Sequence, residues 1–140
     1  MNVLDTNIWI YRHDTRDPKK QLAAKNLLSI LGPLALPWQV GCEFIAASRK
    51  LAPIGFDEAT AWNALADMQL MSVVVLMPVP QLWQEARLLQ ARHMLSFWDA
   101  LMVAACILGG VNVLYTEDMG APRQIDSLAL VNPFLAGPNS

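Results

Sequence analysis

Four carboxylates occupy positions in which a charged side chain is unusual. Asp5 and Asp118 each follow a short apolar run, so both are expected at the carboxyl ends of strands. Glu43 and Asp99 lie inside apolar segments with helical spacing. Because burial of an unpaired carboxylate is costly, four such residues of one chemical type indicate a shared ligand.

A ligand set of oxygens without histidine or cysteine favours Mg²⁺ or Mn²⁺. These ions keep several waters and bind through a few carboxylates together with substrate phosphates. Cys42 and Cys106 lie far apart in apolar segments, so we expect two buried thiols and neither a zinc site nor a redox pair. An ion in an acidic pocket can activate water for attack on phosphorus, which is the chemistry of phosphodiester hydrolysis.

Two of the acids also have an interpretation as helix caps. Asp5 precedes a predicted helix, and we assign the capping role there to Thr6 rather than to Asp5. Asp99 stands three residues after Ser96, which is the spacing of a capping box. Read alone, Asp99 is better explained by the cap.

The other two acids have structural alternatives as well. Glu43 has Arg49 as an ion-pair partner in the same segment, and Asp118 can hold a turn before Gly120. These separate explanations do not account for the shared chemical type of all four residues, which have few basic residues near them in sequence.

Strands and helices are predicted to alternate along the chain. The spacing of apolar residues predicts helices over 18–31, 38–51, 56–71, 81–93 and 97–108. Apolar runs predict strands over 3–4, 73–76, 111–115 and 128–131. The β-branched run Val73–Leu76 has the composition of an interior strand. The alternation predicts an α/β fold with a mostly parallel sheet and helices on both faces.

Length and composition predict one domain with an apolar partner surface. The chain has 140 residues, 54% hydrophobic and 16% charged. We expect a domain over 1–134, a frayed tail over 135–140 and a charge-poor surface that binds a partner or a second copy. Core packing is expected for most of the five tryptophans.

The net charge argues only weakly against a nucleic-acid ligand. The formal charge of −2 gives no general attraction to it. If four of the twelve acids hold metal, however, eight acids face ten Lys and Arg, a surplus of +2. No signal peptide is expected because Asp5 interrupts the first apolar residues, and the apolar stretch 100–111 is too short to span a bilayer. A cytoplasmic protein without membrane contact is expected.

Five segments, in order and over nearly the whole chain, resemble PIN-domain proteins, in particular the ribonuclease toxins of VapBC-type toxin–antitoxin pairs. They are Leu4-Asp-Thr-Asn7, Glu43, Ser96-Phe-Trp-Asp-Ala-Leu-Met-Val-Ala-Ala105, Leu114-Tyr-Thr-Glu-Asp-Met119 and Val131-Asn-Pro-Phe134.

The resemblance implies a PIN-like three-layer α/β/α fold and an endoribonuclease that uses Mg²⁺ or Mn²⁺. The catalytic and metal-binding residues that it implies are Asp5, Glu43, Asp99 and Asp118. Thr6 and Thr116 would be accessory hydroxyl residues. Glu117 adjoins Asp118, and the pattern favours Asp118 as the residue that faces the metal. The implied partners are RNA, a VapB-type antitoxin and a second copy in a homodimer, with Trp9 or Trp62 available for the antitoxin.

Two other functions remain open from the sequence. In a phosphatase of the haloacid-dehalogenase type, Asp5 would be a phosphorylated nucleophile, but that family has a second Asp where this chain has Asn7. The second alternative is a PIN-like module that has lost catalysis and only binds a partner. The presence of all four acids argues against it.

Overall fold

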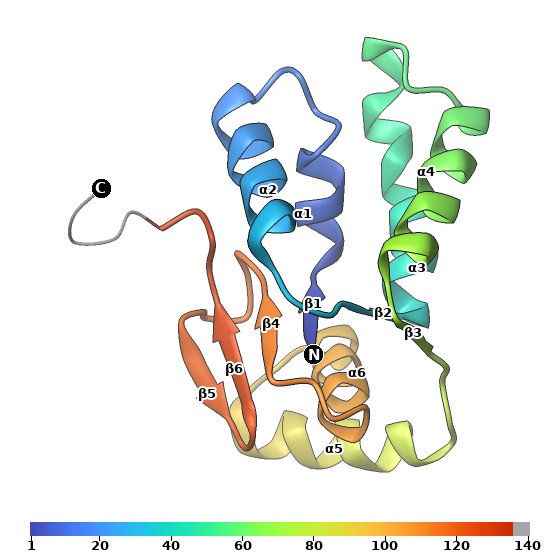
Figure 1. The fold of residues 1–140 in the computed structure, drawn as a ribbon. Helices are drawn as coiled ribbons and strands as arrows, with labels where there is room; N and C mark the ends of the chain where they lie inside the picture. Colours follow the sequence, from blue (N-terminus) through green and yellow to red (C-terminus); the bar gives the residue numbers. More distant parts are fainter. Residues whose placement is uncertain (136–140) are drawn as a thin grey trace.

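The computed structural model describes residues 1–135, whose backbone forms six short strands (Figure 1). They are β1 (Asn2–Leu4), β2 (Ala35–Pro37), β3 (Val74–Leu76), β4 (Val113–Tyr115), β5 (Arg123–Ile125) and β6 (Leu128–Val131). The tail expected over 135–140 lies, apart from Leu135, outside the described residues. Strand β5 was not predicted, because its sequence Arg-Gln-Ile lacks an apolar run.

The strands are mostly parallel. Four of them form a sheet in the order β1-β4-β6-β5, in which β5 alone is antiparallel to its neighbour. Strands β2 and β3 form a parallel pair, and a bridge between Asn2 and Leu34 places that pair beside β1. Leu4 is aligned with Tyr115, and Tyr115 with Val131. The residues that follow β1 and β4 therefore emerge at the same edge of the sheet.

Helices surround the strands on both sides, as the predicted α/β/α layering requires. They are α1 (Thr6–Tyr11), α2 (Pro18–Ile30), α3 (Trp38–Ala47), the 3-10 helix η1 (Ser48–Ile54), α4 (Glu58–Met71), α5 (Gln81–His93) and α6 (Phe97–Leu108). In Figure 1, α1 to α4 lie above the strands β1 to β3, and α5 and α6 lie below them. The helix predicted over 38–51 is divided at Ser48, where the 3-10 helix begins.

Apolar side chains from both groups of helices meet the sheet in one core. Val3, Leu4 and Leu114 on the strands are at most 1% exposed, and so are Phe44 on α3 and Met102 on α6. Because helices cover both faces of the sheet, the sequences of the central strands are apolar throughout and do not alternate between apolar and polar residues.

The prediction of an interior strand at Val73–Leu76 is wrong. Strand β3 pairs only with β2 among residues 1–135, so it lies at an edge, and Val73 and Val74 are 67% and 39% exposed. Its β-branched composition reports strand propensity and does not distinguish an edge from the centre.

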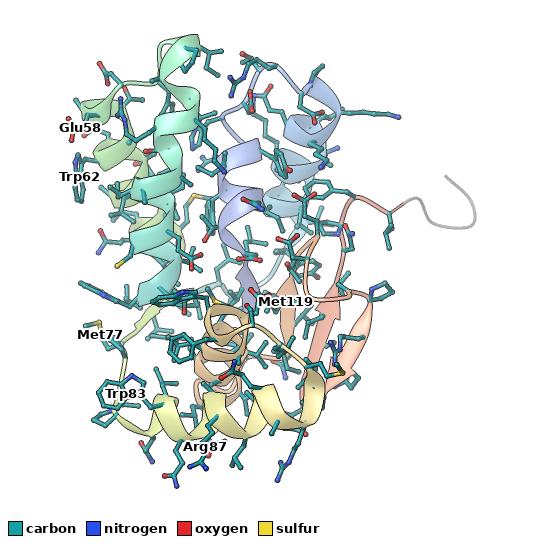
Figure 2. All side chains as sticks on the ribbon, turned by 180° about the vertical axis from the view of Figure 1, so that it is seen from behind. Glu58, Trp62, Met77, Trp83, Arg87 and Met119 are labelled. Carbon is teal, nitrogen blue, oxygen red and sulfur yellow. The ribbon has the colours of Figure 1, made fainter. Side chains whose placement is uncertain are left out.

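Most tryptophans are also at the surface, against expectation. Trp9 is in the core, whereas the other four are 51–70% exposed, namely Trp38, Trp62, Trp83 and Trp98. Figure 2 shows Trp62 of α4, Met77 after β3 and Trp83 of α5 projecting from one side of the molecule. Cys42 is exposed as well, and only Cys106 is the predicted buried thiol.

Within the described part of the chain, no single helix is both long and apolar enough to cross a membrane. Helices α5 and α6 reach the necessary length only as a pair, and they are bent by 114° relative to each other.

Candidate active site

Asp5 connects strand β1 to helix α1 and is held from two sides. Its Oδ1 accepts a hydrogen bond of 2.8 Å from the backbone N–H of Thr6, and its Oδ2 accepts one of 2.8 Å from Oγ1 of Thr116. Asp5 is thus the N-cap of α1, and the assignment of that cap to Thr6 is wrong. The cap uses only one carboxylate oxygen, and the residue is 9% exposed. Capping and lining the cavity are therefore compatible roles.

Glu43 is fixed by neutral donors. Its Oε2 accepts a 2.8 Å hydrogen bond from Oγ1 of Thr6, and its Oε1 accepts one of 2.7 Å from Nε2 of Gln39, one turn earlier on α3. The alternative of an ion pair with Arg49 is not found among the described residues. The charge of Glu43 therefore remains without a direct cationic partner.

Asp99 lies in the first turn of α6, close to the side chain of Ser96. Oγ of Ser96 accepts a 3.2 Å hydrogen bond from the backbone N–H of Asp99, so Ser96 is the N-cap. The reciprocal bond of a capping box, from the Ser96 N–H to the Asp99 side chain, is absent from the hydrogen bonds of residues 1–135. The Asp99 carboxylate therefore does not have the capping function that the sequence suggested.

Asp118 and Glu117 follow β4 and have different surroundings. The backbone N–H of Asp118 donates a 3.0 Å hydrogen bond to Oγ1 of Thr116, and Nδ2 of Asn7 lies 3.5 Å from its Oδ2. The carboxylate of Glu117 instead accepts hydrogen bonds from Tyr11 and Lys20. Glu117 does not line the cavity described next, and Asp118 does.

The four predicted carboxylates lie around one cavity of about 450 Å³. Strand ends contribute Asp5 and Asp118, and helices α3 and α6 contribute Glu43 and Asp99. The rest of the lining is Thr6, Asn7, Ala46, Ala47 and Lys50. The cavity lies at the carboxyl edge of the parallel strands, which is the usual place for ligands in an open α/β sheet.

The surroundings disfavour ionisation of two of these acids. Burial raises the pKa of the Asp5 carboxyl, hydrogen bonds from Thr116 and Thr6 lower it, and the nearby charges of Glu43 and Asp118 raise it further. Burial also raises the pKa of Asp99, the side chain of Ser96 lowers it, and the charges of Asp118 and Glu43 raise it further. Like charges gathered without compensation are stabilised by a bound cation.

The chemistry of the lining fits Mg²⁺ or Mn²⁺. The four carboxylates, one hydroxyl and one amide of the lining supply oxygen ligands, which these ions prefer. As the side chains stand, no three His, Cys, Asp or Glu residues within 1–135 surround a single metal position. The volume of about 450 Å³ leaves room for the waters that Mg²⁺ retains, so a few direct ligands suffice.

Gln39 and Asn7, two residues near the carboxylates, were not singled out for the site from the sequence. Gln39 holds Glu43, Asn7 contacts Asp118, and Lys50 lines the cavity. Gln39 was detectable in principle because it precedes Glu43 by four residues on one helix, where side chains meet. The place of Lys50 at the cavity gives no such signal, since Lys50 reaches it only through the path of η1.

Three solved structures have the same fold. VapC20 of Mycobacterium tuberculosis, described as a Sarcin-Ricin loop cleaving toxin, is 22% identical, with 86% of this chain and 92% of that chain covered and a TM-score of 0.67. A toxin–antitoxin complex from Klebsiella pneumoniae is 18% identical, with coverages of 96% and 98% and a TM-score of 0.67. VapBC2 from Rickettsia felis, bound to a promoter DNA fragment, is 15% identical, with coverages of 92% and 96% and a TM-score of 0.64.

Comparison with curated protein sequences gives no match. The model of the PIN domain family, in contrast, matches residues 3–125. The match includes all four acids of the cavity and, except for Asn2, every strand up to β5. On this evidence, together with the shared fold, the chain belongs to the PIN domain family.

Proposed function

We propose that this protein is a metal-dependent endoribonuclease that hydrolyses RNA phosphodiesters. The observation that carries the proposal is the gathering of Asp5, Glu43, Asp99 and Asp118 around one cavity at the carboxyl edge of the sheet. These residues come from four separate elements, and none of their charges is neutralised by an ion pair among residues 1–135.

The metal would be Mg²⁺ or Mn²⁺, held by Asp5 and Asp99 with support from Glu43 and Asp118. Such an ion, when bound, activates water and stabilises charge on the leaving oxygen. The protein contributes the orientation of the ligands, because Thr116 holds Asp5 and Thr6 holds Glu43. Lys50 adds a positive charge at the wall of the cavity, suited to a phosphate of the RNA backbone.

The nuclease assay needs wild-type protein and two variants. RNA cleavage should require added Mg²⁺ or Mn²⁺, and Asp5→Ala and Asp99→Asn should abolish it while circular dichroism shows an intact fold. Cleavage by either variant at the wild-type rate would refute the site assignment. Metal binding without any nuclease activity would support the binding-module alternative. Trapping of phosphate or a metal fluoride on Asp5 would support the phosphatase.

We further propose that the protein is the toxin of a toxin–antitoxin pair in the cytoplasm and forms a homodimer. The neighbours with the same fold include one protein described as a toxin, one toxin–antitoxin complex and VapBC2. An apolar cavity of about 260 Å³ between α3 and α4, lined by Trp38, Ile45, Trp62 and Leu65 among others, offers a protein partner an apolar binding surface.

Growth experiments test the toxin function separately from the nuclease activity. Expression of the wild-type protein alone should arrest growth, and co-expression of the product of a small adjacent open reading frame should relieve the arrest. Asp99→Asn is the matched control and should not arrest growth. Harmless expression of a protein that cleaves RNA in vitro would remove the toxin function and leave the nuclease function in place.

A further inference from the structure

The residue next to Asp118 is the centre of a second polar cluster. Oε1 of Glu117 accepts a hydrogen bond of 2.5 Å from the hydroxyl of Tyr11, and its Oε2 lies 2.8 Å from Nζ of Lys20. Nζ of Lys20 also donates a 3.1 Å hydrogen bond to the Tyr11 hydroxyl. These three side chains form a closed triangle in which each contacts the other two.

Aromatic rings cover this triangle. Nζ of Lys20 lies 4.5 Å from the centroid of the Tyr11 ring and 5.2 Å from that of Phe134. The rings of Tyr11 and Phe134 meet edge to face, with centroids 5.2 Å apart. The side chains of Lys20 and Glu117 are 34% and 18% exposed. Partial exclusion of water strengthens this ion pair relative to one at an open surface.

The cluster joins the N-terminal helices α1 and α2 to the segments that follow strands β4 and β6. Tyr11 ends α1, Lys20 lies on α2, Glu117 follows β4, and Phe134 follows β6. We call these four residues the Glu117 latch. In Figure 2, the label Met119 marks the loop after β4 that the latch holds.

We propose that the Glu117 latch positions Asp118 in the acidic cavity. The inference rests on the proposed metal-dependent function and extends it to residues outside the cavity. The loop is fixed at two points, because Oγ1 of Thr116 accepts from the Asp118 N–H and the latch holds the Glu117 side chain. Beyond Asp118, Met119 and Gly120 both have positive φ and turn the chain back. Because its own N–H and the side chain of the adjacent Glu117 are both held, Asp118 has little freedom to leave the cavity.

The latch also separates two adjacent carboxylates. If the charge of Glu117 were free, Glu117 would compete with Asp118 for a cation. A shift of the loop by one residue would point the Glu117 side chain to where the Asp118 side chain now points. Lys20 supplies the charge of Glu117 with a partner inside the protein. Residues that hold a metal ligand in place affect metal affinity about 10- to 100-fold when they are changed. Lys20, Tyr11 and Glu117 are therefore positioning residues for the metal site.

Mn²⁺ binding to the RNA-free protein tests the latch without measuring activity. Titration calorimetry should give a Kd about tenfold higher for Lys20→Met than for wild type. Tyr11→Phe removes only one hydroxyl and should raise the Kd about threefold, so that a measurable variant remains if Lys20→Met does not fold. Lys20→Arg keeps the charge and should stay within about twofold of wild type. Lys19→Met, at an exposed position of the same helix, is the matched control and should leave the Kd unchanged.

Kinetic measurements provide a second readout. In Lys20→Met, the Mg²⁺ concentration for half-maximal RNA cleavage should rise with the Mn²⁺ Kd, while the rate at saturating metal changes less. Lower melting temperatures with unchanged Mn²⁺ affinity in Lys20→Met and Tyr11→Phe would refute the latch, because they would show a purely structural role. A wild-type protein that binds Mn²⁺ but cleaves no RNA would refute the proposed nuclease, and the Mn²⁺ affinities of the variants would still decide the inference.

Discussion

Helix α3 separates two regions of opposite character. On one side, Glu43 and the other acids form a polar cavity with uncompensated charge. On the other side, Trp38 and Cys42 line the apolar cavity toward α4 and a second apolar cavity, of about 200 Å³, toward α6. In the first region four carboxylates face the single positive charge of Lys50, and in the second the described chain supplies no apolar cover. The difference indicates an ion with phosphate for one region and a protein partner for the other.

The largest expected effect is a loss of RNA cleavage, without a loss of stability, when an acid of the cavity is neutralised. Asp99→Asn should lower RNA cleavage by about 1,000-fold or more, because it removes one of the proposed metal ligands. Its melting temperature should stay equal to wild type or rise, because repulsion by Asp118 and Glu43 disappears. Single-turnover cleavage assays and thermal unfolding measure the two quantities. A parallel loss of both would show that Asp99 is a structural residue.

A substitution of a core residue on α3 should destabilise the helix that both regions share. Phe44 is fully buried on the helix that carries Glu43 and Trp38. Phe44→Ala should therefore reduce the free energy of unfolding by about 3–5 kcal/mol, measured by urea denaturation. Cys42→Ser, at an exposed position of the same helix, is the control, with an expected change below about 0.5 kcal/mol. An equally small change for Phe44→Ala would contradict the role of α3 as the common support.

A charge in the apolar cavity should affect only partner binding. Trp62 is 55% exposed and lines the cavity between α3 and α4. Trp62→Lys should raise the Kd for the proposed antitoxin about 10- to 100-fold, while RNA cleavage stays at the wild-type rate. Trp83→Lys is the control, because Trp83 is 70% exposed but lines none of the three cavities described above. Equal losses in both variants would show that the cavity itself is not the binding surface.

The smallest effect concerns the packing of His13 between Phe44 and Phe56. The ring centroid of His13 lies 6.1 Å and 4.9 Å from theirs, and burial, with smaller effects of Arg12 and Lys25, lowers the pKa of His13 to about 4. The unfolded chain binds this proton near pH 6.5, so stability should fall as the pH drops from about 6.5 to 4. The ring is partly exposed, and we expect a loss of about 1–2 kcal/mol.

Urea denaturation at pH 7.5 and at pH 4.5 measures this loss. His13→Gln should remove that part of the pH dependence, whereas the carboxylates of the cavity act equally in both proteins. The same decrease of stability in His13→Gln and in wild type would exclude His13 as its source.

Local patterns in the sequence were sufficient for most of the helices and for singling out the four acids. The helices at 81–93 and 97–108 follow apolar spacing and have the predicted bounds. The meeting of Asp5 with Asp118 follows from the rule that parallel strands end at one edge, and the structure has that arrangement. The catalytic roles of the four acids remain predictions.

The features that could not be predicted depend on distant pairings. The Glu117 latch joins residues 97 and 106 positions apart, and no local pattern indicates which side chains will meet. The edge position of β3 and the exposure of Trp38 and Trp98 depend likewise on which strands and helices become neighbours. Residue type alone indicates that these side chains are apolar and not where they lie.

The edge position of β3 has a practical consequence for handling the protein. An edge strand presents unpaired N–H and C=O groups, and those of β3 are flanked by the exposed side chains of Val73, Val74 and Met77. Such an edge is a template for strand pairing between molecules. Purified without a partner, the protein should aggregate as its concentration rises, and co-expression with the proposed antitoxin should keep it soluble.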